Sequence, residues 1–85
     1  MSKSLNIDEE VIKKLFLKYE NQQFETVLNE TKILTKKFPN SFILWKIMGS
    51  ANLSLGFLKE AEISFLKAIQ LNKNDNNVFS NLGIV

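Results

Sequence analysis

The sequence contains no cysteine and no histidine. Without thiols it forms no disulfides and has no cysteine nucleophile, and without imidazoles it lacks the most common acid–base catalyst. Thiolate and imidazole, the usual ligands of a closed zinc site, are therefore missing. The three glycines are too dispersed to form a phosphate-binding loop. These absences predict a protein that is not an enzyme and that holds no metal or cofactor.

Long apolar runs and strong charge are also missing. No run approaches the roughly 18–20 apolar residues that a membrane-spanning helix needs, and no signal-peptide-like run follows Met1. We therefore expect a cytoplasmic location by default and no membrane partner. The net charge of +2 is small, and the basic cluster of Lys32, Lys36 and Lys37 lacks interleaved aromatic residues. A nucleic-acid partner is therefore not expected.

The apolar residues recur at three- and four-residue spacing, which is typical of amphipathic helices. We predict about five helices, at residues 8–21, 24–37, 42–55, 58–71 and 76–85. Pro39 ends the second helix, Asn40 or Ser41 caps the third, and Gly56 is expected at a positive φ after it. In the fourth helix, the residues expected to face inward are Leu58, Ala61, Phe65 and Ala68. The sequence thus indicates an all-α fold.

The chain repeats itself at a constant offset. Asn40 falls on Asn74, since 74 − 40 = 34, and at the same offset Gly49 falls on Gly83. A repeat of this length built from two helices is the period of the tetratricopeptide repeat (TPR) family. Residues 42–75 resemble a well-formed TPR through Trp45, Met48, Gly49, Gly56, Ala61, Phe65 and Ala68. Asn52 stands where Tyr is usual, and Lys73 where Pro is usual.

The TPR resemblance covers residues 8–85 and implies a single domain over residues 1–85. Residues 8–41 are similar to a degenerate repeat, and residues 76–85 to the first helix of a truncated third repeat. The implied architecture is an α-solenoid, a right-handed stack of antiparallel helix pairs. The same residues are similar to the N-terminal repeats of bacterial multi-repeat TPR proteins, so we expect this chain to be part of a larger protein.

The register of the first helix has two alternatives. An ungapped alignment with the next repeat puts Lys14 and Lys18 at buried positions. Shortening the turn at residues 20–23 by one residue puts a different set on the packing face: Ile12, Leu15, Phe16 and Tyr19. Because lysines are rarely buried without partners, we favour the shortened turn. The aromatic residues expected in the core, rather than around a ligand, are Phe16, Tyr19, Trp45, Phe65 and Phe79.

In TPR stacks the first helix of each pair lines a concave groove that receives a peptide or a partner helix. The resemblance therefore implies that residues between the packing positions bind a protein partner. In the middle repeat these are Ile43, Lys46, Ser50 and Leu53. With the shortened turn, the first repeat contributes Lys13, Leu17 and Glu20, and the third contributes Asn77, Ser80 and Ile84. Arginine is absent and Ile47 replaces an expected Asn, so a chaperone-type carboxylate clamp is not expected.

An assembly role is the alternative. The fifth predicted helix has no partner helix after it, so its apolar residues would lack cover. Exposed apolar surface at the end of a stack favours pairing with another copy. The residues expected to mediate such a homo-oligomer are Phe79, Leu82, Ile84 and Val85.

Overall fold

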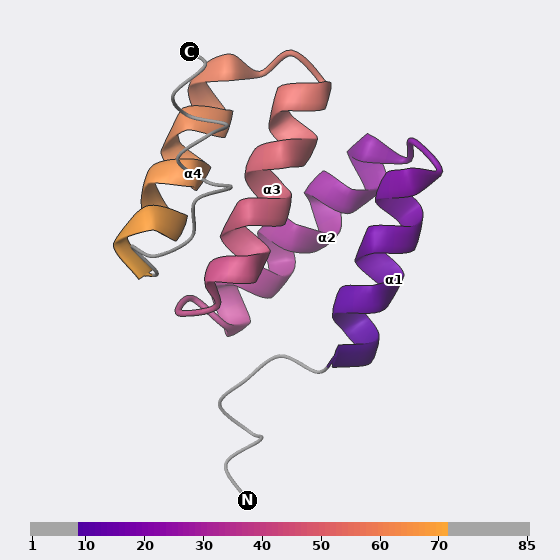
Figure 1. Ribbon diagram of the computed structural model, residues 1–85, viewed down its shortest axis with the longest axis horizontal. Coiled ribbons are helices and arrows are strands. Elements are labelled where there is room, and N and C mark those ends of the chain that lie inside the picture. Colours follow the sequence, from indigo (N-terminus) through magenta and orange to yellow (C-terminus); the bar gives the residue numbers. More distant parts are fainter. Residues whose placement is uncertain (1–8, 72–85) are drawn as a thin grey trace, which may run out of the picture.

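The computed structural model describes residues 9–71, a range that contains four helices and no strand (Figure 1). They are α1 (Glu9–Glu20), α2 (Phe24–Lys37), α3 (Phe42–Ser54) and α4 (Leu58–Leu71). These bounds agree with the predicted helices to within one residue, and the all-α class is confirmed. The fifth predicted helix, at residues 76–85, lies outside the described residues.

Charged residues at the helix ends match the helix dipole. Glu9, Glu25 and Glu60 occupy first turns, and Lys18 and Lys36 occupy last turns. Carboxylates are favoured near the partly positive N-terminus of a helix and cations near its C-terminus. Helix α3 has no such charges and is the most apolar of the four. Ser41 precedes it as the N-cap residue, although its side chain makes no capping hydrogen bond.

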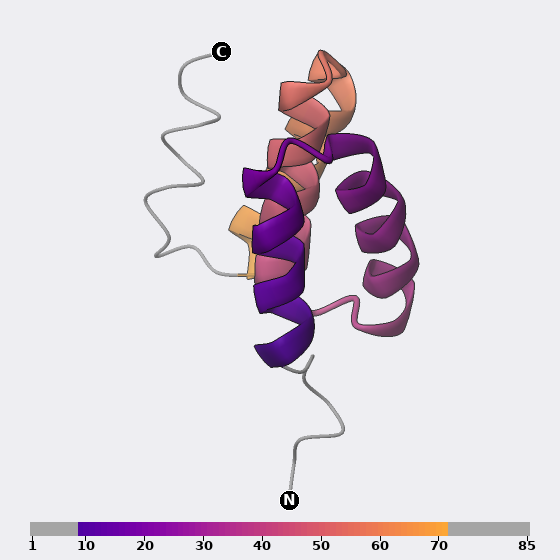
Figure 2. The same cartoon turned by 90° about the vertical axis from the view of Figure 1, so that its right-hand side faces the viewer.

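Successive helices run antiparallel, and α3 is the central helix (Figure 1). It packs against α2 on one side and α4 on the other, with a smaller contact to α1. Figure 2 shows α1 and α3 overlapping in one layer, with α2 in a second layer. The main core lies between α1, α2 and α3, and its buried residues are Leu15, Val27, Leu28, Leu44, Ile47, Met48 and Ala51.

A second buried cluster joins α4 to α3. It consists of Ala61, Phe65 and Ala68, against which Trp45 packs. Trp45 also packs on the main core, so one side chain links both clusters. Its indole N–H donates a 2.9 Å hydrogen bond to the carbonyl of Pro39, which ties the α2–α3 turn to α3.

One residue of α4 does not lie where the sequence predicted. Ala61, Phe65 and Ala68 face inward as expected, but Leu58 is 59% exposed. At 100° per residue, Leu58 lies at the edge of the helix face that contacts α3. Ser64, which is buried, completes that face instead.

The prediction of a shortened first turn is wrong. Helix α1 ends at Glu20 and α2 begins at Phe24, whereas α3 ends at Ser54 and α4 begins at Leu58. Both bounds move by the same amount, since 54 − 20 = 34 and 58 − 24 = 34. The two turns therefore have equal length, and the ungapped register applies.

The two lysines that argued against this register are accommodated in different ways. Lys18 donates to Glu30 of α2 at 2.6 Å, with side chains 34% and 38% exposed. Lys14 is exposed, because α1 is the outer helix of the described bundle (Figure 1). The argument from lysine burial failed because one lysine has a partner and the other is not buried.

The two equal turns also share their backbone geometry. In each, two successive amides after the helix donate back to carbonyls of its last turn, as in a Schellman motif. The central residue has a positive φ: 85° at Gly56, as predicted, and 64° at Gln22. Glycine adopts this conformation without steric strain, whereas a residue with a Cβ does not.

We expect Gln22→Gly to stabilise the protein. Relief of the left-handed strain is worth about 1–2 kcal/mol, and the greater entropy of glycine in the unfolded chain offsets about half of it. The net gain of about 0.5–1 kcal/mol should raise the thermal midpoint by about 3–6 °C. Gly56→Ala at the equivalent position should lower it. A lower midpoint for Gln22→Gly in a circular-dichroism melt would contradict the role of this turn.

Candidate functional site

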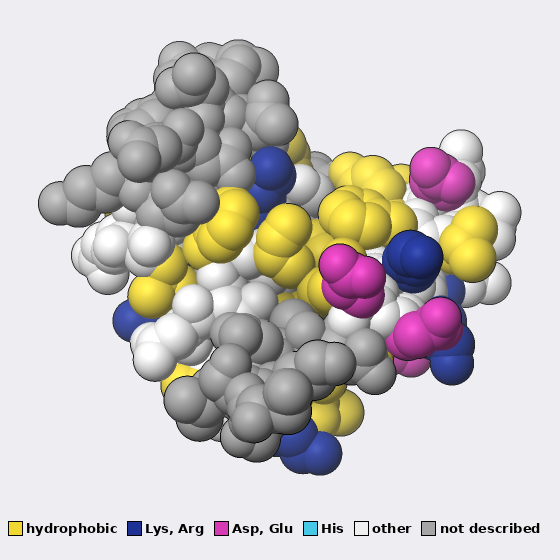
Figure 3. Space-filling model, turned by 60° about the horizontal axis from the view of Figure 1, so that its bottom comes forward, with side chains coloured by type: hydrophobic (Ala, Val, Ile, Leu, Met, Phe, Trp, Pro, Cys, Tyr) yellow, Lys and Arg dark blue, Asp and Glu magenta, His cyan; other side chains and the backbone are white. Residues whose placement is uncertain are grey.

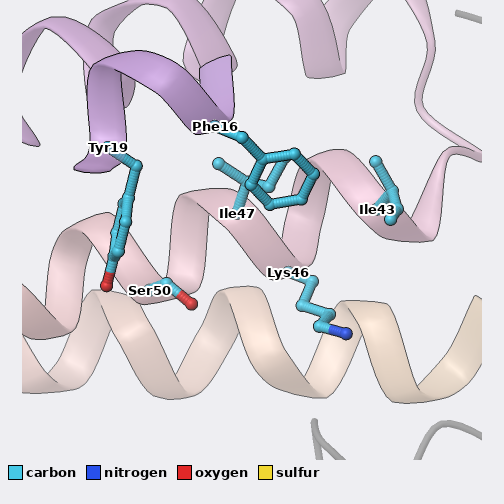
Figure 4. A pocket seen from close by; sticks show the side chains of 6 residues that line it. All are labelled: Phe16, Tyr19, Ile43, Lys46, Ile47 and Ser50. Carbon is cyan, nitrogen blue, oxygen red and sulfur yellow. The ribbon is translucent and has the colours of Figure 1, made fainter. Parts of the chain in front are cut away.

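An apolar depression lies between α1 and α3 (Figure 4). Helix α1 contributes Phe16 and Tyr19, and α3 contributes four residues, Ile43, Lys46, Ile47 and Ser50. The depression has a volume of about 100 Å³ and an almost entirely apolar lining. We call these six residues the α1–α3 depression.

Helical spacing brings these side chains together. The four α3 residues follow an i, i+3, i+4, i+7 pattern, and the two α1 residues are three apart, so each set lies on one face of its helix. Ile47 is 5% exposed and belongs to the main core, so it forms the floor. The Phe16 ring stands beside it as a wall, 46% exposed.

The other aromatic wall is held in place by its neighbours. The Tyr19 ring meets the Phe24 ring edge-on at 5.0 Å between centroids. Its hydroxyl forms a 3.1 Å hydrogen bond with the Ser54 hydroxyl, either group being able to donate. With both ends of the side chain engaged, the ring loses little further freedom when a ligand contacts it.

The size of the depression limits what it can hold. Drug-sized ligands occupy pockets of roughly 300–1,000 Å³, and an engineered apolar cavity of about 150 Å³ holds benzene. About 100 Å³ is therefore room for one aliphatic side chain and too little for a cofactor. The site suits a protruding side chain of another polypeptide.

The structure places the predicted groove residues in three groups. Lys46 and Ser50 line the depression together, as does Ile43. Leu53, on the same helix, is 37% exposed but is not a lining residue. Lys13, Leu17 and Glu20 are exposed on α1 outside the depression. Asn77, Ser80 and Ile84, together with the proposed assembly residues Phe79, Leu82 and Val85, lie outside the described residues.

Sequence reasoning missed Phe16 and Tyr19 as surface residues of this site. Both were assigned to the core, but Phe16 is nearly half exposed and Tyr19 is only partly buried. The signal that could have found them is the ungapped offset, which takes Ser50 to Phe16 and Leu53 to Tyr19 (50 − 16 = 34, 53 − 19 = 34). The shortened turn shifted the assignment by one residue, to Leu17 and Glu20.

Apolar residues are also exposed away from the depression. The large ones are Leu17, Ile33, Leu53, Phe57, Leu58, Ile63 and Leu66. On the face in Figure 3, apolar side chains extend across the middle and charged side chains gather toward the right, where α1 lies. Of these outlying residues, Leu58, Ile63 and Leu66 share one helix, α4.

Within residues 9–71, no three His, Cys, Asp or Glu side chains are grouped so that they could hold a metal ion. None of α1–α4 is long and apolar enough to cross a membrane. Comparisons of this chain with protein-family models, with curated proteins and with solved structures find no match.

Proposed function

We propose that this chain is a non-catalytic protein-interaction module that binds a peptide or helix across α1 and α3. The observation that carries the proposal is the α1–α3 depression, an apolar hollow sized for one side chain and built by two neighbouring helices. A cytoplasmic module of this kind needs no cofactor, because binding uses only apolar contact and surface charge.

The proposed architecture is a TPR-like solenoid of antiparallel helix pairs. Three observations support it: equal turns, helix ends that recur at the offset of the sequence repeat (71 − 37 = 34) and positive φ values at that same offset (56 − 22 = 34). In such a stack α1 and α3 are the first helices of their pairs, and they share the concave side. The α1–α3 depression lies on that side of the proposed stack.

Partial exposure of aromatic and aliphatic side chains favours binding at this site. Phe16, Ile43 and Tyr19 offer rigid apolar area that loses little entropy when covered. The floor is already packed, because Ile47 belongs to the main core. A partner side chain would therefore enter a hollow that needs little rearrangement.

Panning a displayed library of random peptides against the protein tests this proposal. We expect enriched peptides to lose about tenfold in affinity when Phe16→Asp removes the wall and adds a charge, a loss that corresponds to about 1.4 kcal/mol. Leu17→Asp is the matched control, since Leu17 is the next residue of α1, is 59% exposed and lies outside the depression. It should leave affinity unchanged. Equal effects of the two variants would remove the depression as the binding site.

A second candidate function, self-assembly, has its own supporting observation. The outer side of α4 exposes Leu58, Ile63 and Leu66, and adjacent exposed apolar residues favour association. Light scattering after size-exclusion chromatography should then show a dimer at high concentration that Leu66→Lys dissociates. A wild-type monomer at every concentration would eliminate this candidate.

A further inference from the structure

We propose that the partner segment presents one branched aliphatic side chain, with an acidic side chain beside it. This inference rests on the proposed function and specifies the ligand chemistry of the same site. The aliphatic group fills the α1–α3 depression, and the carboxylate pairs with Lys46 at its rim.

The aliphatic part follows from volume and lining. The hollow of about 100 Å³ is smaller than the cavity of about 150 Å³ that holds benzene, so an indole or phenol ring does not fit. Phe16, Ile43 and Ile47 surround this space with carbon atoms. A buried polar side chain would find few hydrogen-bond partners there and would lose its hydration. Leu, Ile or Val meets both conditions.

The acidic part follows from charge. Lys46 is the one charged residue among the six lining residues, and its amine extends along the edge opposite Phe16 (Figure 4). On the exposed side of α1, Lys13 and Glu20 flank Phe16 with opposite charges that largely cancel. Lys46 therefore sets the sign of the local field, which attracts a carboxylate and repels a cation.

The two parts are compatible in an extended peptide. Side chains two residues apart point to the same face of a strand, about 6–7 Å apart. Lysine has a long flexible stem and can meet a carboxylate at that distance from an anchored aliphatic group. The expected motif is therefore an aliphatic residue with Asp or Glu within two positions.

The peptides enriched in the panning experiment test this motif. We expect most of them to carry Leu, Ile or Val with Asp or Glu within two positions. For the peptide of highest affinity, Lys46→Gln should weaken binding about twofold to fivefold, the range for a partly exposed ion pair. The same variant should not weaken an otherwise identical peptide in which the acidic residue is changed to its amide. Lys32→Gln, on α2, is the charge-matched control and should have no effect on either peptide.

Each remaining outcome overturns the inference in a recognisable way. Peptides that depend on Phe16 but show no acidic preference, or that lose equally with and without the acid, would refute the Lys46 pairing and leave the proposed function intact. Tighter binding after the aliphatic residue is changed to Trp would refute the size argument. Absence of any Phe16-dependent peptide would refute the proposed function, and this inference with it.

Discussion

Phe65→Ala is expected to lower the free energy of unfolding by about 3–5 kcal/mol. The ring is 2% exposed and fills the space between α4 and α3, where Ala61, Ala68 and Trp45 surround it. Alanine would leave a cavity that these rigid helices cannot close. At about 0.05–0.15 kcal/mol per residue, a chain of 85 residues has roughly 4–13 kcal/mol of stability in total, so this loss is a large fraction of it.

Urea unfolding followed by helical circular dichroism measures the effect of Phe65→Ala. Leu66→Ala is the matched control, because Leu66 is the next residue of α4 and is 44% exposed. It should cost less than about 1 kcal/mol. Similar losses for the two variants would contradict the inward orientation of Phe65.

Gly49→Ala should destabilise the protein, although alanine is normally the better helix former. A Cβ at this position would meet three Phe65 ring atoms at 2.7, 2.8 and 2.9 Å. Overpacking costs about 1–3 kcal/mol, and three contacts this short place the cost in the upper half of that range. Subtracting the gain in helix propensity of about 1 kcal/mol leaves a net loss of about 1–2 kcal/mol. The clash prevails because the buried ring has no free space into which to move.

A double-mutant cycle isolates the contact between Gly49 and Phe65. If the clash is with the ring, Phe65→Leu should relieve it. The cost of Gly49→Ala should then fall by about 0.5 kcal/mol or more, since this is the lower end of the range for coupled neighbours. Strictly additive losses in urea unfolding would mean that Gly49 is needed for another reason.

Periodicity predicted the helices well. Apolar spacing and strong stop signals, such as Pro39 and Gly56, set the helix bounds through local interactions. The inward position of Phe65 and the small residue at Gly49 were also predictable, because both follow from how two helices dock. The fifth predicted helix, at residues 76–85, stays a prediction because it lies beyond the part of the chain that the structure describes.

The groove on α1 was less predictable, for a physical reason. Lys18 appeared unfit for a partly buried position because its partner, Glu30, lies twelve residues away on another helix. Sequence spacing cannot reveal such an ion pair. The resulting one-residue shift assigned Lys13 and Leu17 to the groove in place of Phe16 and Tyr19.

Exposure at the edge of a helix face also escapes the sequence. Phe16 and Leu58 continue apolar stripes and were both expected inside, yet they are 46% and 59% exposed. Burial at a stripe's edge depends on whether a neighbouring helix covers it, which is a tertiary property. The depression exists because such an edge, on α1, lies beside α3.

Methyl NMR tests the central claim, peptide binding at the α1–α3 depression, most directly. In protein labelled at its isoleucine methyl groups, Ile43 and Ile47 report on the depression, and Ile33 and Ile63 report on exposed surface elsewhere. Titration with the peptide of highest affinity from the panning should shift the Ile43 and Ile47 signals and leave those of Ile33 and Ile63 in place. Shifts at Ile63 with unmoved Ile43 and Ile47 signals would contradict the account.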